Sequence, residues 1–157
     1  MIKINVGCGG DYLPGYVNVD VDPAIKADLY CDINVHLPYP SNSVDFIKAF
    51  DILEHLDVRG VKEIYRVLRV GGLLYIRVPH YLCRNAYSDF THSHYFNSIT
   101  LHNSVFRVFD VVYQKVWYSF ADHYITFTLP PWLCNLHERC LPGVLPPSHI
   151  ICKLRKR

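Results

Sequence analysis

Closely spaced cysteine pairs are missing from this sequence, although it contains six cysteines in 157 residues. No C-x-x-C pair occurs, which argues against a zinc ribbon and against a redox dithiol. Most of the thiols are therefore expected to be buried as small apolar side chains. A disulfide between Cys134 and Cys140 stays open, because the two are near each other in sequence and intracellular disulfides do occur in hyperthermophiles.

Long apolar runs and a strong net charge are also missing. Half of the residues are hydrophobic, yet no uninterrupted apolar segment approaches the roughly 20 residues that a membrane span requires. The chain enters its first expected strand at Ile2 and shows no amino-terminal signal, so we expect no membrane span and a cytoplasmic location. A formal net charge of +2 argues against nucleic acid as a partner.

A short β-branched run, residues 2–6, ends in three glycines within four positions: Gly7, Gly9 and Gly10. This pattern predicts a buried strand followed by a tight loop where the backbone can approach a ligand. A second run, residues 16–22, ends in Asp20 and Asp22. A carboxylate at the carboxyl end of a second parallel strand is placed to bind a ribose diol. A plain turn is the alternative interpretation of the glycines.

Only residues 7–16 separate these two expected strands, and Pro14 and Gly15 lie among them. A parallel crossover normally takes a dozen or more residues and contains a helix. We therefore expect the first helix to be shortened or missing.

At this point the sequence resembles the class I S-adenosylmethionine-dependent methyltransferases, of the group called methyltransferase type 11. The resemblance covers roughly residues 2–115 and rests on the glycine motif at 5–10, on Asp20, and on later segments in the family's order: 31–33, 50–56 and 63–74. It implies an α/β fold with a Rossmann-like sheet, mostly parallel, with an antiparallel strand near the carboxyl terminus. Asn5 stands where the family usually has an acid.

The resemblance also implies S-adenosyl-L-methionine as the cofactor and suggests which residues contact it. Asp20 would bind the ribose, Asp32 and Ile33 the adenine, and Asp51 and Ile52 the methionine and methyl end. The full set of expected cofactor-binding residues is Gly7, Cys8, Gly9, Gly10, Asp20, Val21, Asp32, Ile33, Asp51 and Ile52.

Other segments predict the remaining elements of one domain over residues 1–157, a length that supports one core but not two. Apolar residues at 61, 64, 65 and 68 have helical spacing, and Gly71 and Gly72 are expected to end that helix. Residues 73–78 are expected to form a strand buried on both sides. Residues 118–147, rich in aromatics and proline, are a candidate lid or sheet cover, and a homodimer interface there stays open.

Several histidines follow the expected strand at 73–78, where ligands of open α/β sheets bind. Methyl transfer needs an aligned nucleophile and, when the acceptor carries a proton, a base, which histidine can supply near neutral pH. We hypothesise that His80 or His92 is this base or positions the substrate, with Asp89 orienting it. His92 and His94 could instead hold a loop, and His55 could cap a loop or lie over the cofactor. We assign no metal, although His80, His92 and His94 with Asp89 or Cys83 form a conceivable ligand set.

The sequence thus predicts an enzyme that transfers a methyl group from S-adenosylmethionine to an unidentified oxygen or nitrogen acceptor, on a small molecule or a macromolecule. A nicotinamide-dependent Rossmann enzyme is disfavoured because G-x-G-x-x-G is absent, with Tyr12 at the last glycine position. A non-catalytic module that binds the cofactor or acts as a scaffold is the other alternative, because fold does not fix function.

Overall fold

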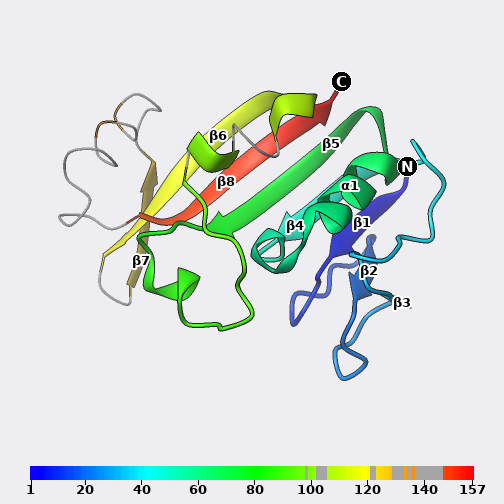
Figure 1. The fold of residues 1–157 in the computed structure, drawn as a ribbon, viewed down its shortest axis with the longest axis horizontal. Coiled ribbons are helices and arrows are strands. Elements are labelled where there is room, and N and C mark those ends of the chain that lie inside the picture. Colours follow the sequence, from blue (N-terminus) through cyan, green and yellow to red (C-terminus); the bar gives the residue numbers. More distant parts are fainter. Residues whose placement is uncertain (98, 102–105, 121–122, 129–132, 134–135, 137–146) are drawn as a thin grey trace.

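The computed structural model describes residues 1–97, 99–101, 106–120, 123–128, 133, 136 and 147–157. Its central feature is an eight-stranded sheet in the order β3-β2-β1-β4-β5-β8-β6-β7 (Figure 1). The strands are β1 (Lys3–Val6), β2 (Val17–Asp20), β3 (Leu29–Tyr30), β4 (Val44–Phe50), β5 (Leu68–Pro79), β6 (Phe109–Phe120), β7 (His123–Thr128) and β8 (Pro147–Lys156).

The first five strands are parallel, so their carboxyl ends share one edge of the sheet. β8 lies between β5 and β6 and is antiparallel to both, and β7 adds to β6 at the far edge. This confirms the predicted mostly parallel Rossmann-like sheet with an antiparallel strand near the carboxyl terminus. The arrangement brings the last strand of the chain beside β5, in the middle of the sheet (Figure 1).

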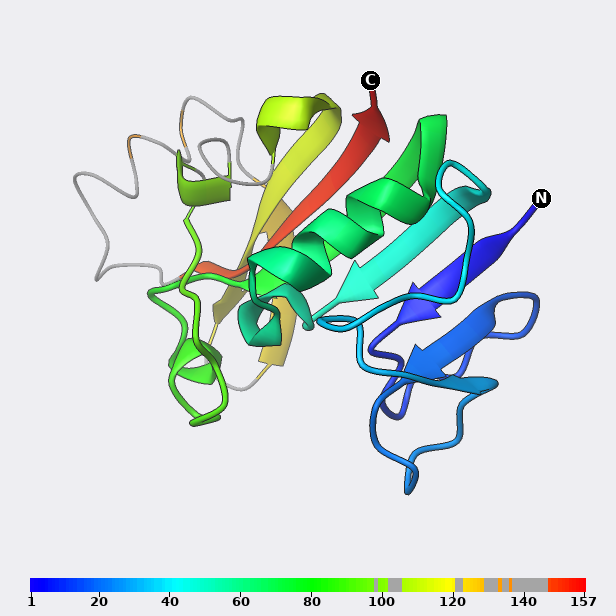
Figure 2. The same ribbon diagram turned by 45° about the vertical axis from the view of Figure 1, so that its right-hand side comes forward.

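Helix α1 (Val58–Val67) covers one face of the sheet, as Figure 2 shows, and the hydrophobic core includes residues of both. Alternate residues of β4 and β5, such as Ile47, Leu74 and Ile76, are buried there with Ile64 of α1. Burial of aliphatic side chains of this size stabilises a fold by roughly 1.5–3 kcal/mol each. One apolar cluster extends from Ile4 in β1 to Leu154 in β8.

The helix boundaries differ from the sequence prediction. α1 begins after Asp57, whose carboxylate accepts hydrogen bonds from the amides of Arg59 and Gly60, as an N-cap side chain does. It ends at Val67, so Gly71 and Gly72 do not end the helix. They lie within β5. The periodicity continues to Leu68, but the backbone of Leu68 is already extended, so a buried side chain there belongs to the strand.

β5 also differs, because it is not buried on both sides. Leu74, Ile76 and Val78 are buried, whereas Leu73, Tyr75 and Arg77 on the opposite face are partly exposed. On that face Tyr75 packs edge-on against Phe50 and Tyr113, with ring centroids 4.9 and 6.1 Å apart. Tyr and Phe rings in such pairs stabilise each other modestly while remaining open to solvent on one side.

The first crossover contains no helix, as expected, since residues 7–16 form only bends and turns. The buried side chain of Asn18 in β2 holds this loop instead. Its Oδ1 accepts hydrogen bonds from Leu13 N (2.9 Å) and Asn5 Nδ2 (3.1 Å), and its Nδ2 donates to Leu13 O (3.1 Å) and Asp28 Oδ2 (2.9 Å). A side-chain amide thus satisfies backbone groups that a helix would have paired internally.

Two earlier expectations fall mainly outside the described residues. Of the candidate lid or cover at 118–147, the structure describes the end of β6, β7, residues 133 and 136 and the start of β8. Cys134 and Cys140 both lie outside the described residues, while Cys8, Cys31, Cys83 and Cys152 are free thiols. Within the described part of the chain, no helix is long and apolar enough to cross a membrane.

Replacing Asn18 with alanine is expected to lower the free energy of unfolding by about 3 kcal/mol, because several buried polar groups would lose their partners at once. Urea denaturation measures this change. The matched control is Asn85→Ala at an exposed position, where the expected change is below about 0.5 kcal/mol. Equal stability of the two variants would contradict the role given to Asn18.

Candidate functional site

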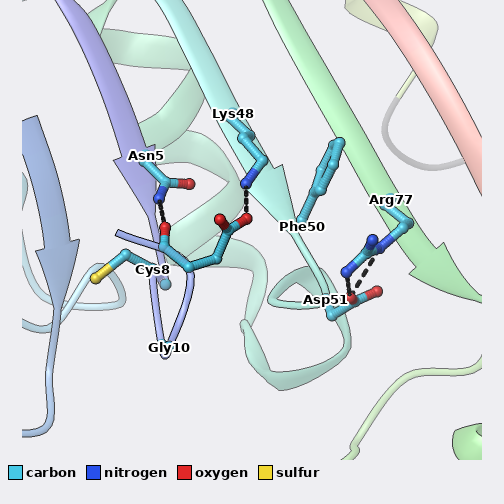
Figure 3. A pocket seen from close by; sticks show the side chains of 10 residues that line it. Asn5, Cys8, Gly10, Lys48, Phe50, Asp51 and Arg77 are labelled. Atoms are coloured by element: carbon cyan, nitrogen blue, oxygen red, sulfur yellow. Dashed lines mark hydrogen bonds and ion pairs between the residues drawn. The ribbon is translucent and has the colours of Figure 1, made fainter. Parts of the chain in front are cut away.

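A cavity of about 210 Å³ opens where β1, β4 and β5 end, as Figure 3 shows. Its position at the carboxyl ends of parallel strands is the usual ligand position in open α/β sheets. The lining residues are Asn5, Gly7, Cys8, Gly9, Gly10, Asp11, Lys48, Phe50, Asp51 and Arg77. Half of the expected cofactor-binding residues are among them: Gly7, Cys8, Gly9, Gly10 and Asp51.

Two glycines of the loop differ in whether a side chain would fit at their position. Gly7 has a φ of +61°, and a Cβ there would lie 2.6 Å from Ile52 Cγ1, so both backbone and packing exclude a side chain. Around Gly10, by contrast, a Cβ would meet no protein atom within 4 Å. Ile52, expected to contact the cofactor, packs beneath the loop against Gly7 and the core.

Two ion pairs line the cavity. Lys48 Nζ in β4 is 2.5 Å from Asp11 Oδ2 in the glycine loop. Arg77 in β5 binds Asp51 through both Nε, at 2.8 Å from Oδ2, and Nη2. The Phe50 side chain lies between the two cations (Figure 3). Lys48 Nζ is 4.4 Å and Arg77 Cζ 4.7 Å from its ring centroid. The sequence analysis did not name Lys48 or Arg77 as site residues. Their positions as charged residues inside otherwise apolar strands could have indicated them.

Asp51 is the residue with the most unusual environment in the cavity. It directly follows β4 and has a φ of +51°, a conformation that Asp tolerates better than most residues. Its Oδ2 is bound to Arg77, but its Oδ1 is buried and has no hydrogen-bond partner in the part of the chain that the structure describes. His149 Nε2 lies 3.9 Å from this oxygen. A buried acceptor without a donor is costly, so this oxygen has an unused capacity to accept a hydrogen bond.

The residues expected to bind ribose and adenine do not line this cavity. Asp20 lies beside the glycine loop, where its Oδ2 accepts from Gly9 N (2.8 Å) and its Oδ1 from Asp22 N (3.0 Å). Val21 and Asp32 are exposed, and Ile33 is buried in the core. The cavity therefore has room for one end of a nucleoside ligand, with Asp20 beside its rim.

His80, one of the expected catalytic residues, is fully buried at the end of β5. Its Nδ1 accepts a hydrogen bond from Leu82 N (3.2 Å), and its backbone amide donates to Ser148 O in β8 (3.0 Å). These contacts fix the turn that follows β5.

Asp89 and His92 lie near His55, for which the sequence analysis left two roles open. Asp89 Oδ1 accepts from Thr91 Oγ1 (2.7 Å), and Thr91 Oγ1 contacts His55 Nδ1 (2.9 Å), so Asp89 orients His55 rather than His92. The rings of His55 and His92 meet edge-to-face with centroids 4.6 Å apart. Burial, followed by the neighbouring His92, lowers the pKa of His55 below its usual range. The Thr91 hydrogen bonds lower the pKa of Asp89.

Glu54 was missed as a site residue. It lies in the 3₁₀ turn η1 (Leu53–His55) and is 1% exposed. Burial, with a smaller contribution from the negative charge of Asp51, raises the pKa of its carboxyl to about 8. Its Oε2 is buried without a hydrogen-bond partner among the described residues. Its place beside His55 was visible in the sequence, but its burial depends on the segment after β5.

Comparison with known proteins now gives the family. A family model described as a methyltransferase domain matches residues 4–76. A search of curated proteins finds no match. Residues 4–76, slightly less than half of the chain, thus match a methyltransferase domain, and the fold of the described chain is that of class I S-adenosylmethionine-dependent methyltransferases. S-adenosylmethionine is the cofactor of that family.

Several solved structures share the fold at low sequence identity. A SAM-dependent methyltransferase from Archaeoglobus fulgidus is 15% identical, with a TM-score of 0.65 over 98% of this chain and 85% of that one. A possible histamine N-methyltransferase from Thermotoga maritima is 16% identical, with a TM-score of 0.65 over 99% and 82%. The [4+2]-cyclase SpnF is 18% identical, with a TM-score of 0.64 over 98% and 74%. Similarity at this level concerns the fold.

Substitution of Gly7 with alanine is expected to cost roughly 2–4 kcal/mol of unfolding free energy, from the positive φ and the contact with Ile52. Gly10→Ala, where space is open, is expected to cost less than about 1 kcal/mol. Denaturant unfolding of both variants measures the difference. Adding Ile52→Val to Gly7→Ala should recover part of the loss, whereas purely additive effects would show that the two residues do not conflict.

Proposed function

We propose that this protein binds the methionine end of S-adenosylmethionine in the cavity at the glycine loop and transfers the methyl group to an oxygen or nitrogen of an acceptor. The observation that carries the proposal is Asp51, which lines a cavity bordered by the family's glycine motif and whose buried Oδ1 has no hydrogen-bond partner among the described residues. An ammonium group is the donor that such a carboxylate oxygen binds best.

The charges of the cavity fit the two charged groups of a methionine moiety. Asp51 offers an acceptor to the ammonium group, while Lys48 and Arg77 add positive charge near the position of a carboxylate. Gly7, Cys8, Gly9 and Gly10 shape the wall against which the ligand lies. Ile52 supports that wall from below.

The remaining contacts of the proposed complex lie beyond the cavity. Asp20 would bind the ribose by exchanging its hydrogen bond with Asp22 N for one with a ribose hydroxyl, while still accepting from Gly9 N. Val21, Asp32 and Ile33 would border the adenine, Ile33 through its backbone because its side chain is in the core.

The bound cofactor supplies an activated methyl group, so the protein mainly has to align the acceptor and receive its proton where it has one. His92 is proposed to face the acceptor, because its Nδ1 is held by Ala86 O (2.9 Å) and its Nε2 is left for another partner. Asp89 acts as a positioning residue through Thr91 and His55. His80 positions the turn that follows β5.

Asp51→Asn is expected to weaken binding of S-adenosylhomocysteine at least about tenfold, because a charged acceptor for an ammonium group is lost. Asn also tolerates a positive φ, so the fold should persist. Isothermal titration calorimetry measures the affinity. Asp110→Asn on β6, whose exposed pair with Arg157 is not at the cavity, is the matched control and should bind as the native protein does.

The same titration separates the alternatives. Binding of NAD in place of S-adenosylhomocysteine, or equal affinity of Asp51→Asn and the native protein, would contradict the proposal. Label from methyl-labelled S-adenosylmethionine should appear in an extracted metabolite or macromolecule pool. Cofactor binding without label transfer to any pool would instead support a non-catalytic module or another reaction, as the fold of SpnF illustrates.

A further inference from the structure

A carboxylate and two imidazoles meet where η1 lies against the segment that follows β5. The backbone carbonyl of Glu54 accepts hydrogen bonds from Ser93 N (2.9 Å), Ser93 Oγ (3.1 Å) and His94 N (3.3 Å), which fixes the two segments side by side. Residues far apart in sequence, Glu54, His55 and His92, are thereby brought together.

The hydrogen bonds of the two rings determine which nitrogen is available. His92 Nδ1 lies 2.9 Å from Ala86 O, and because a carbonyl only accepts, Nδ1 carries the proton. Thr91 Oγ1 donates to Asp89 Oδ1, so it must accept from His55 Nδ1. In the neutral form of each ring, Nε2 is therefore the nitrogen with a free lone pair. Histidines that bind metals are usually held in this way, with the second nitrogen donating to a carbonyl or to a group linked to a carboxylate.

The third group is Glu54, which is 99% buried and whose Oε2 has no hydrogen-bond partner in the described residues. One potential ligand atom from each of Glu54, His55 and His92 lies within 4.8 Å of the others. Ligands that share an ion at about 2.1 Å are at most about 4.2 Å apart, so a shift of under about 1 Å would close the site. No other such group of His, Cys, Asp and Glu occurs in the described part of the chain.

We propose that Glu54, His55 and His92 bind one divalent transition-metal ion through a carboxylate oxygen and two imidazole nitrogens. Two histidines and one carboxylate favour Fe²⁺, Co²⁺ or Zn²⁺ and leave coordination positions open. Mg²⁺ is disfavoured because it prefers oxygen ligands. The site replaces the group His80, His92 and His94 with Asp89 or Cys83 that the sequence suggested as a conceivable ligand set.

The ion would lie near the cavity, because Asp51 lines that cavity and the turn η1 with Glu54 and His55 follows Asp51 after one residue. An acceptor oxygen could then occupy an open coordination position, and His92 would contact the acceptor through the ion. This last role rests on the proposed function, whereas binding of the metal does not.

The test uses the full chain, treated with EDTA, dialysed and titrated in the absence of cofactor. Zn²⁺ binding is followed by calorimetry and Co²⁺ binding by its visible absorption bands. One equivalent is expected to bind, with about 10- to 100-fold weaker affinity in His92→Ala and in Glu54→Gln. His94→Ala, an exposed imidazole two residues from His92, is the matched control and should bind as the native protein does.

Unchanged Zn²⁺ affinity in His92→Ala, or the absence of saturable binding by the native protein, would overturn the proposal. A loss in His94→Ala equal to that in His92→Ala would do the same. Because Glu54→Gln alters a buried residue, the thermal midpoint of each variant is also measured with and without Zn²⁺. At the same Zn²⁺ concentration, the ion should raise the midpoint of the native protein and of His94→Ala equally and raise that of His92→Ala by less. A separate titration with S-adenosylhomocysteine tests the proposed function, so the two can fail independently.

Discussion

The whole site depends on how the glycine loop is held without a helix behind it. In residues 7–16 no backbone ladder fixes the loop, and the buried amide of Asn18 takes over this role by bonding Leu13, Asn5 and Asp28. A fully satisfied buried amide is specific, because any other arrangement leaves polar groups unpaired. At the start of this loop Gly7 lies so close to Ile52, after β4, that a Cβ at Gly7 would be 2.6 Å from Ile52 Cγ1.

The second organising feature is the shared edge of the parallel strands. Since β1, β4 and β5 end at the same edge, the residues that follow or end them converge although they are distant in sequence. Asp51 follows β4 and meets Arg77 of β5, and the next turn carries Glu54 and His55. The cavity at the glycine loop and the histidine cluster are thus neighbours because one short segment, residues 51–55, contributes residues to both.

Much of the fold was predictable because local signals and the family motifs agreed. The glycine motif, the short crossover with Pro14 and Gly15, and the family's motif order led to the correct sheet class and to the missing helix. The predicted end of α1 at Gly71 and Gly72 was wrong because apolar periodicity continues to Leu68, where the backbone is already extended. Burial of β5 on both sides was also wrong, because burial depends on what covers each face and not on the strand's own composition.

The site was predictable only in part, for a physical reason. Glycines and strand-end acids have local signatures, so five of the cavity's ten lining residues were named in advance. Lys48 and Arg77 pair with residues of distant loops, and the backbone of Glu54 is bound by a segment about 40 residues later in the chain. Likewise, Asp89 was expected to orient His80 or His92, but its link runs through Thr91 to His55, 36 residues from Thr91. Such partners are set by tertiary contacts that a single sequence does not encode locally.

A crystal structure of the protein with S-adenosylhomocysteine tests the central claim most directly. The account predicts that the amino group of the ligand donates to Asp51 Oδ1, with the amino-acid end against the glycine loop and the sulfur directed toward the His55 and His92 side. A nucleoside bound elsewhere on the sheet, with Asp51 Oδ1 still lacking a donor, would contradict it.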